Sequence, residues 1–304
     1  MTLALLCSGQ GTQHRDMFAL TADAAPDLFD HAAGLLGADP RELVRRDGAN
    51  IFYNHTGQIL CTLQAVSARC LLDGLLPNRL VIAGYSVGEL AAWGVAGAID
   101  PIRTLDLASA RAQAMDEVSD ANDGMLFLRG LTLEEAERVS RRHGCAVAIV
   151  NPGDAYVLAG PGKGLDAIVA ELGARGIKTR HLGVHVASHI PRLAAASTVF
   201  AGVLAASGAK RLGPSIRLLS GIDGAGVADP ASGLDKLARQ LSTTIHWADC
   251  LESCVEAGAS AFLELGPCRA LAEMARITYP DIPSRALDDF RSLDGVRLWL
   301  EKQR

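Results

Sequence analysis

The sequence predicts an α/β protein with a mostly parallel sheet flanked by helices, and two observations support this fold class. Short apolar runs that end in glycine, "TLALLCSG" at 2–9 and "RLVIAG" at 79–84, are typical of buried parallel strands. Stretches typical of helices lie between these runs and after them. Strands that alternate with helices favour helices layered on a parallel sheet.

Three helices are expected around the second strand. The first covers 58–76, and the other two cover 87–99 and 101–118. Asp100 followed by Pro101 is typical of an N-cap followed by proline at the first helical position. The third helix is therefore predicted to begin at Pro101.

Residues 123–184 have a rhythm of their own. Their expected elements follow the order β-α-β-β-α-β, with strands at 124–130, 145–151, 155–161 and 177–184 and helices at 132–144 and 164–176. This is the order of the ferredoxin-like split unit. We therefore expect 123–184 to be a ferredoxin-like α+β subdomain, inserted into an α/β core made of 1–122 and 185–304.

The rest of the chain returns to the core. The Gly- and Pro-rich segment 211–233 predicts a loop around one short strand. Helices are expected at 234–241, 248–258 and 268–276, and "AFLELG" at 261–266 is expected to be the final core strand.

Composition excludes several classes of protein. The 304 residues carry a formal net charge of −5, which gives no general field for nucleic acid or an anionic membrane. The seven cysteines are scattered, with no C-x-x-C pair and no metal-ligand spacing. The first residues show no signal-peptide pattern, and no apolar run is long enough to span a bilayer. We expect a soluble cytoplasmic protein that binds no metal, nucleic acid or membrane.

The stretch "VIAGYSVGELAAW" at 81–93 contains the pattern G-x-S-x-G where a predicted strand becomes a predicted helix. In this setting the pattern indicates a nucleophile elbow, which presents the hydroxyl of Ser86 above the helix N-terminus. Free N–H groups at that terminus can stabilise an oxyanion. Ser86 is therefore the candidate nucleophile.

A serine nucleophile needs a base, and "HVASHIP" at 185–191 places two histidines on a loop after the expected subdomain. His185 and His189 are thus the candidate bases. Among the other histidines, His14, His31 and His143 are expected to be solvated, and His55 and His246 to be structural or pocket-edge residues; His181 is assigned no role.

Several segments together resemble one family. They are "SGQGTQ" at 8–13, "GYSVGELAAWGVAGAI" at 84–99, the arginine in "ASARAQAM", "VASHIP" at 186–191, "RQL" at 239–241 and "FLELGP" at 262–267. In order and spacing they resemble the malonyl-CoA:acyl carrier protein transacylase family over essentially the whole chain. The resemblance implies a hydrolase-like core and an acyltransferase that uses no cofactor.

The resemblance also implies roles for individual residues. Ser86 would attack the thioester of malonyl-CoA, and His189 would act as its base, oriented by the backbone carbonyl of Gln240 rather than by an acid. The backbone N–H groups of Gln10 and Val87 would form the oxyanion hole. No catalytic aspartate is then expected.

Two further residues would bind the acyl group by the same comparison. Arg111 would grip the free carboxylate of malonate, since a guanidinium can pair with a carboxylate through two parallel hydrogen bonds. A charged helix face shared with Arg103 and Asp106 is the structural alternative for Arg111. Gln58 would be a second polar group of the pocket.

The chain departs from the family at two positions. Tyr85 stands where the family usually has histidine, and Ser8 replaces a usual proline. Tyr85 would pack beside the acyl pocket or donate its hydroxyl to the substrate. With "NHTGQILCT" at 54–62, Tyr85 makes the chain most similar to the epsilon subunit of bacterial malonate decarboxylase. His185 loosely matches a motif position that correlates with acyl choice in polyketide relatives.

The expected partners are malonyl-CoA and an acyl carrier protein, namely the carrier subunit of malonate decarboxylase or, alternatively, the carrier of fatty-acid synthesis. Two other classes of function stay open. An α/β-hydrolase-type esterase or thioesterase would need an acid such as Asp154 or Asp166 and an HGGG-type loop, which the chain lacks. A non-catalytic docking subunit would form no acyl adduct.

Overall fold

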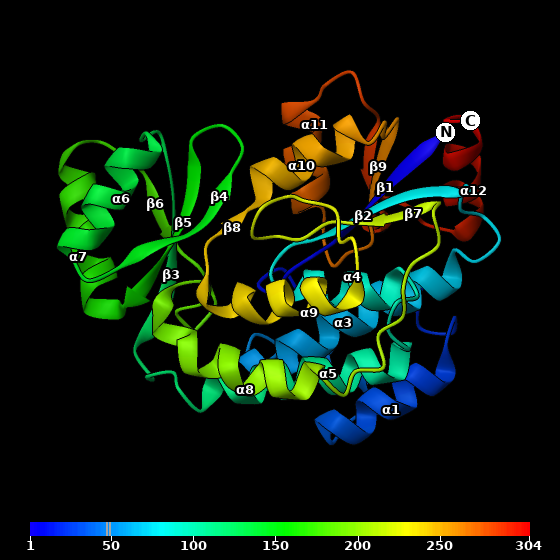
Figure 1. The fold of residues 1–304 in the computed structure, drawn as a ribbon, viewed down its shortest axis with the longest axis horizontal. Coiled ribbons are helices and arrows are strands. Elements are labelled where there is room, and N and C mark those ends of the chain that lie inside the picture. The colour runs from blue at the N-terminus through cyan, green and yellow to red at the C-terminus, as the bar shows by residue number, and fades with distance from the viewer. Residues whose placement is uncertain (47, 49) are drawn as a thin grey trace.

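The computed structural model describes residues 1–46, 48 and 50–304, and these form two sheets with helices around them (Figure 1). The core sheet has the order β10-β9-β1-β2-β7, and all its paired strands are parallel. Its strands are β1 (Thr2–Cys7), β2 (Arg79–Gly84), β7 (Ile216–Leu218), β9 (Ala261–Glu264) and β10 (Ser284–Ala286). The expected α/β fold with a mostly parallel sheet is confirmed.

The central strand β1 is buried on both faces of this sheet. Leu3, Leu5 and Cys7 pack into one hydrophobic cluster, and the alternate residues Ala4 and Leu6 pack into another. Successive side chains of a strand point to opposite faces of the sheet. Because both faces are covered here, side chains on both sides of β1 must be apolar, which explains its uninterrupted apolar run.

Helices cover both faces. On the side of Leu3 and Leu5 lie α3 (Asn54–Leu71), α4 (Val87–Val95), α5 (Pro101–Asp116), α8 (Ala194–Leu204) and α9 (Pro230–Arg239). On the opposite side lie α10 (Trp247–Glu256) and α11 (Ala270–Thr278). Shorter or outer helical elements are α1 (Pro26–Leu36), α2 (Pro40–Leu43), α12 (Leu293–Glu301), η1 (Pro191–Leu193), η2 (Gln240–Ser242) and η3 (Leu287–Asp289).

The start of α5 follows from its sequence. The carboxylate of Asp100 accepts hydrogen bonds from the backbone N–H groups of Ile102 and Arg103 at 3.0 and 3.2 Å, and Pro101 is the first helical residue. These contacts satisfy two N–H groups that have no partner within the helix.

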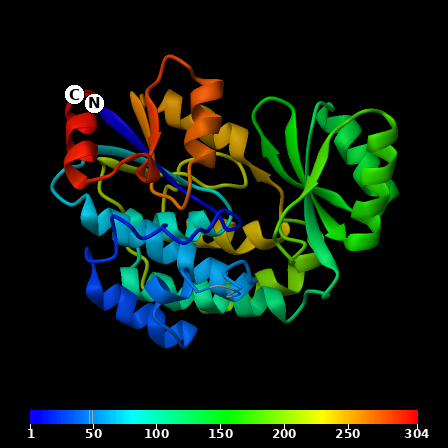
Figure 2. The same ribbon diagram turned by 180° about the vertical axis from the view of Figure 1, so that it is seen from behind.

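The second sheet has the order β6-β3-β5-β4-β8 and stands beside the core in both views (Figures 1 and 2). Its elements are β3 (Asp123–Arg129), α6 (Leu133–Arg142), β4 (Ala146–Asn151), β5 (Ala155–Pro161), α7 (Gly162–Ala174), β6 (Thr179–His181) and β8 (Ile245–His246). The first six follow one another in the order β-α-β-β-α-β. The boundaries of a separate subdomain, 123 and 184, stay a prediction.

Two strands differ from the sequence-based expectation. β9 is not the final core strand, because β10 follows it and pairs with it in parallel. β8 was not expected at all. It adds a parallel edge to β4 although its two residues lie far along the chain from the rest of the second sheet. Strands this short carry too little periodicity to be recognised.

Among the helices described in residues 1–46, 48 and 50–304, none has both the length and the apolar character needed to cross a membrane.

Candidate active site

Ser86 lies at the carboxyl end of β2, immediately before α4. Its backbone has φ 58° and ψ −119°, a conformation that residues with a side chain rarely adopt. Positive φ is also found at His189 (φ 63°). Strained residues of this kind persist only where the surrounding packing holds them, and they gather at functional sites.

The elbow is held by close backbone contacts with the end of β1. A Cβ atom at Gly88 would lie 2.1 Å from the carbonyl oxygen of Cys7, and a Cβ at Gly9 would lie 2.8 Å from the carbonyl oxygen of Tyr85. Only glycine permits these approaches. Ser8 adds to the junction by donating its hydroxyl to Oε1 of Glu264 at 2.7 Å. The loop at 8–10 is thereby fixed beside Ser86.

We expect Gly88→Ala to destabilise the protein by about 4 kcal/mol or more, because the new methyl group would overlap the β1 backbone. Gly34→Ala is the matched control. Gly34 lies in α1 with nothing within 4 Å of the added Cβ, so this change should be neutral or stabilise by about 0.5–1 kcal/mol. Urea unfolding measures the free energy of unfolding of both variants. Equal free energies for Gly88→Ala and Gly34→Ala would contradict the close packing at the elbow.

Ser86, His189 and Gln240 form a continuous hydrogen-bonded chain. The Oγ of Ser86 lies 2.8 Å from Nε2 of His189, and Nδ1 of His189 lies 2.7 Å from the backbone oxygen of Gln240. A carbonyl oxygen only accepts, so Nδ1 carries the proton and Nε2 is left as an acceptor for the serine hydroxyl. The tautomer is therefore the one that a general base needs.

The environment of His189 favours the neutral ring. Burial, assisted by the charge of Arg111, lowers the pKa of His189 to about 3. The other candidate, His185, is exposed. His189 is 1% exposed and in contact with Ser86, so the structure distinguishes the two histidines.

Arg111 points into the same site although it is 1% exposed. It donates to Oε1 of Gln58 at 2.7 Å and to Oε1 of Gln240 at 2.9 Å. Among the described residues no carboxylate lies within 4.0 Å of it, and its buried Nε has no partner. Burial lowers the pKa of Arg111 to about 10, so the group stays charged at neutral pH. The alternative of a surface ion-pair partner is wrong, because Arg103 rather than Arg111 pairs with Asp106.

Gln10 and Gln58 meet at Asn54, at the start of α3. The Oδ1 of Asn54 accepts from Nε2 of Gln58 at 2.7 Å and from Nε2 of Gln10 at 3.3 Å. Asn54 was not singled out in the sequence because the helix was predicted to begin only at residue 58, whereas α3 begins at Asn54. Val87 is the first residue of α4, so its N–H has no partner within the helix.

One cavity brings the predicted residues together. Polar lining comes from Gln10, Tyr85, Ser86, Arg111, Ser188 and His189, and apolar lining from Met115, Met125, Ile149, Leu182 and Val184. Gln58, Val87 and Gln240 lie behind this lining, in contact with it or next to it in the chain. Met125 and Ile149 belong to the second sheet, so both sheets contribute to the cavity.

Tyr85 separates this cavity from a neighbouring one. It lines both, and its ring packs edge-on against Trp247 with centroids 5.4 Å apart. Burial raises the pKa of the Tyr85 hydroxyl above its usual value, so the group stays protonated. The neighbouring cavity is lined by residues 8–12, by the chain after β6 and by Asn151, and the two cavities share Gly9, Gln10, Leu182 and Val184.

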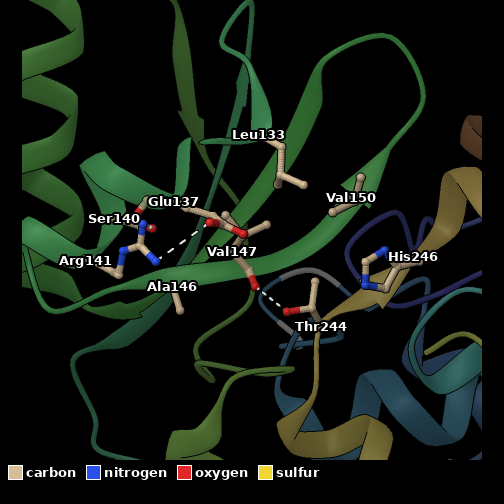
Figure 3. A pocket seen from close by; sticks show the side chains of 9 residues that line it. All are labelled: Leu133, Glu137, Ser140, Arg141, Ala146, Val147, Val150, Thr244 and His246. Atoms are coloured by element: carbon tan, nitrogen blue, oxygen red, sulfur yellow. Dashed lines mark hydrogen bonds and ion pairs between the residues drawn. The ribbon is translucent and has the colours of Figure 1, made fainter. Parts of the chain in front are cut away.

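The acids that a hydrolase would require do not contact His189. Asp154 lies in the β4–β5 turn with φ 51°, and Asp166 pairs with His181 at 3.3 Å. A third depression, shown in Figure 3, lies between α6, β4 and β8. It contains His246 and a hydrogen bond from Thr244 to the carbonyl of Val147 at 2.9 Å, and no residue described as lining it also lines the Ser86 cavity.

Glu89 is the residue of this site that sequence reasoning missed. It is 1% exposed, and its Oε2 accepts from Nε2 of Gln240 at 2.7 Å and from the backbone N–H of Gly221 at 3.0 Å. An acidic residue in a helix is ordinarily taken as exposed. The sequence feature that could have pointed to Glu89 is its position, one helical turn after Ser86 in an otherwise apolar helix.

A parallel α/β core with a strained serine between strand and helix, a buried histidine against it and a buried arginine in one cavity is an arrangement suited to acyl transfer through serine. The model of the acyl transferase domain family matches residues 71–287. The chain therefore belongs to that family, and it is an enzyme of the acyltransferase class.

Individual relatives cover nearly the whole chain. The malonyl CoA-acyl carrier protein transacylase of Mycobacterium tuberculosis is 29% identical over 307 residues, which covers 97% of this chain and 99% of that protein. A polyketide synthase of Streptomyces halstedii, GfsB, is 32% identical over 287 residues, which covers 90% of this chain and 5% of the synthase.

Solved structures agree with the fold. An acyl-carrier-protein S-malonyltransferase from Burkholderia pseudomallei has a TM-score of 0.88 at 26% identity and covers 98% of this chain and 100% of its own. A malonyl-transacylase solved in complex with a type II polyketide acyl-carrier protein has a TM-score of 0.87 at 25% identity, with 99% and 100% covered.

Proposed function

We propose that this protein transfers a malonyl group from malonyl-CoA, through an acyl-enzyme at Ser86, to the thiol of an acyl carrier protein. The observation that carries the proposal is the buried charge of Arg111, which has no carboxylate partner among the described residues and lines the cavity of Ser86. A buried charge without a partner is costly, so its retention favours an anionic ligand. Malonyl supplies that anion, whereas acetyl does not.

The first half-reaction begins at the hydroxyl of Ser86. Its Oγ attacks the thioester carbonyl while Nε2 of His189 takes the hydroxyl proton. The tetrahedral intermediate collapses, the carbon–sulfur bond breaks, and His189 returns the proton to the departing CoA thiolate. In the second half-reaction, the carrier thiol gives its proton to His189 and attacks the acyl-serine, and Ser86 regains its proton.

Two backbone donors would stabilise the intermediate oxyanion. The N–H of Val87 stands at the N-terminus of α4, and the loop with Gln10 is held against the elbow by the approach of Gly9. Donors fixed in advance beside the reacting carbonyl need no reorganisation in the transition state.

Arg111, Gln58 and Tyr85 would determine which acyl group the enzyme accepts. Arg111, which lines the cavity, would pair with the malonyl carboxylate, and Gln58 would hold the guanidinium in place. Tyr85 would close the cavity beside the acyl group through its packing on Trp247.

The acceptor is proposed to be the carrier subunit of malonate decarboxylase, whose arm is a phosphoribosyl-dephospho-CoA group. Tyr85 and "NHTGQILCT" at 54–62 support this choice. The alternative is a phosphopantetheine carrier of fatty-acid synthesis, which fits the relatives named transacylases equally well. Both arms end in a thiol, so the chemistry at Ser86 is the same for both.

The proposal is tested by intact-protein mass spectrometry after brief exposure to malonyl-CoA, followed by addition of each carrier in turn. A gain of one malonyl group that is discharged onto a carrier supports the transferase. The carrier that is malonylated faster identifies the acceptor. Release of free malonate at the same rate with and without carrier would instead support a thioesterase, and no adduct would support a docking subunit.

The pH dependence of loading follows from His189. Its pKa of about 3 lies below the ordinary value, so the ring stays neutral and able to accept a proton as the pH falls. With acetyl-CoA, which has no carboxylate for Arg111, we expect kcat/KM of loading to stay within about twofold from about pH 8 to about pH 5. A histidine of ordinary pKa would lose about 30-fold over that range. Stopped-flow measurement of CoA release distinguishes a buried histidine of lowered pKa from one of ordinary pKa. A 30-fold loss of kcat/KM, about the value for an ordinary histidine, would contradict the assignment of His189 as a desolvated base.

A further inference from the structure

Glu89 is a buried carboxylate with no part in the chemistry proposed above. Its Oε2 contacts Nε2 of Gln240 at 2.7 Å and the N–H of Gly221 at 3.0 Å, and the side chain is 1% exposed. Burying a carboxylate is costly unless hydrogen bonds or charges replace its lost hydration. Those contacts lead to Gln240.

Gln240 is the junction of the site. Its backbone oxygen accepts from His189, its Nε2 donates to the backbone oxygen of Ser86 at 2.9 Å, and its Oε1 accepts from Arg111 at 2.9 Å. The side-chain amide therefore has two acceptors on one end and a cation on the other.

Glu89 and the carbonyl of Ser86 together set the orientation of this amide, and Glu89 is the charged member of the two. An ionised carboxylate only accepts hydrogen bonds, so the NH₂ end of Gln240 must face it. The oxygen end is then directed at Arg111. With the amide turned over, its NH₂ group would face the guanidinium, and neither contact could form.

We propose that Glu89 is a positioning residue for acyl selectivity, fixing the amide of Gln240 so that its oxygen holds Arg111 in line with the malonyl carboxylate. The inference rests on the proposed loading of malonyl at Ser86. It extends that proposal to a residue that does not line the Ser86 cavity.

The charges around Glu89 come from three neighbouring elements. Arg111 of α5 favours its ionised form, and Asp223, in the loop after β7, opposes it. Burial, and after it the charge of Glu89, raise the pKa of the Cys250 thiol in α10, so this thiol stays protonated. Burial is the largest effect and raises the pKa of Glu89 to about 7. Gln240 lies between Glu89 and Arg111, so the carboxylate does not cancel the charge of Arg111 by direct pairing.

The test compares malonyl-CoA and acetyl-CoA loading in Glu89→Gln, the neutral isostere. The change removes the negative charge that Nε2 of Gln240 faces, so the amide is held only by its contacts with the Ser86 carbonyl and Arg111 and by a weaker, neutral hydrogen bond. We expect kcat/KM for malonyl-CoA to fall about 10- to 100-fold, the range for one hydrogen bond to a charged group, and that for acetyl-CoA to change less than about threefold. Glu264→Gln is the matched control: it removes another carboxylate that is 1% exposed but contacts Ser8 and Ala272 instead. It should affect both substrates alike.

The wild-type protein offers a second readout that needs no variant. Because the raised pKa keeps Glu89 ionised only above about pH 7, the malonyl-to-acetyl ratio of kcat/KM should be high above pH 7 and fall below it. In Glu89→Gln the ratio should be low at every pH. A purely structural role would leave the ratio independent of pH.

Two results would overturn the inference: equal losses for both substrates in Glu89→Gln, or a wild-type ratio that does not change between about pH 5 and about pH 9. If Glu89→Gln does not fold, the pH dependence of the malonyl-to-acetyl ratio in the wild-type protein decides alone. Failure of the proposed function is recognised separately, because wild-type protein would then take up no malonyl group at Ser86.

Discussion

Replacing Ser86 by alanine should abolish the malonyl adduct and lower transfer by about 10⁴-fold or more, the scale seen when a serine nucleophile is removed. The structural cost should be small. Ser86 has φ 58°, and alanine meets the same backbone penalty there as serine does. The fold should therefore remain, and the loss should be chemical. Mass spectrometry after exposure to malonyl-CoA measures the adduct, and circular dichroism checks the fold.

Ser188 provides the control for this experiment. It is the other serine lining the same cavity and the chain neighbour of His189, yet it has no contact with the histidine ring that would activate it. Ser188→Ala should still form the adduct. An adduct that survives Ser86→Ala and is lost in Ser188→Ala would overturn the assignment of the nucleophile.

Replacing Arg111 by alanine should impair malonyl loading by about 2–4 kcal/mol, or roughly 30- to 1000-fold, because a buried charge pair with the substrate is lost. Acetyl loading should change far less. The neutral acetyl group has nothing to pair with Arg111, and Ser86 contacts His189 independently of it. Rates of CoA release from the two thioesters give the comparison.

Arg111→Lys and Arg103→Ala complete the series. Lysine keeps the charge but cannot present two parallel donors, so Arg111→Lys should recover only part of malonyl loading. Arg103 is on the same helix but pairs at the surface with Asp106 at 3.8 Å. Arg103→Ala should therefore leave the rates of both malonyl and acetyl loading unchanged. Equal losses of malonyl and acetyl loading in Arg111→Ala would show that the arginine is structural.

The elements that could be predicted from the sequence are those with local signals. The strand before Ser86 and the start of α5 at Pro101 depend on residues next to each other in the chain, and both are found where the pattern places them. Ser86, His189, Gln240 and Arg111, named before the fold was known, are brought into contact with one another. Their roles stay predictions until the variants are measured.

What could not be predicted depends on contacts between distant segments. Glu89 looks like an ordinary acidic residue of a helix until α4 is packed against Gln240 and Gly221, some 150 and 130 residues later. The side chain of Gln240 was missed for the same reason, since the family comparison concerned only its carbonyl. No local pattern reports which end of an amide faces a carboxylate.

The pairing of β8 with β4 has a mechanical consequence. β8 begins five residues after Gln240 and is hydrogen-bonded to the second sheet, while the peptide of Gln240 holds His189 in the core. The second sheet also provides Met125 and Ile149, which line the same cavity as Ser86. A displacement of that sheet away from the core would therefore pull on the peptide that aligns the base. We therefore expect the spacing of the two sheets and the alignment of His189 to be coupled through the short segment between Gln240 and β8.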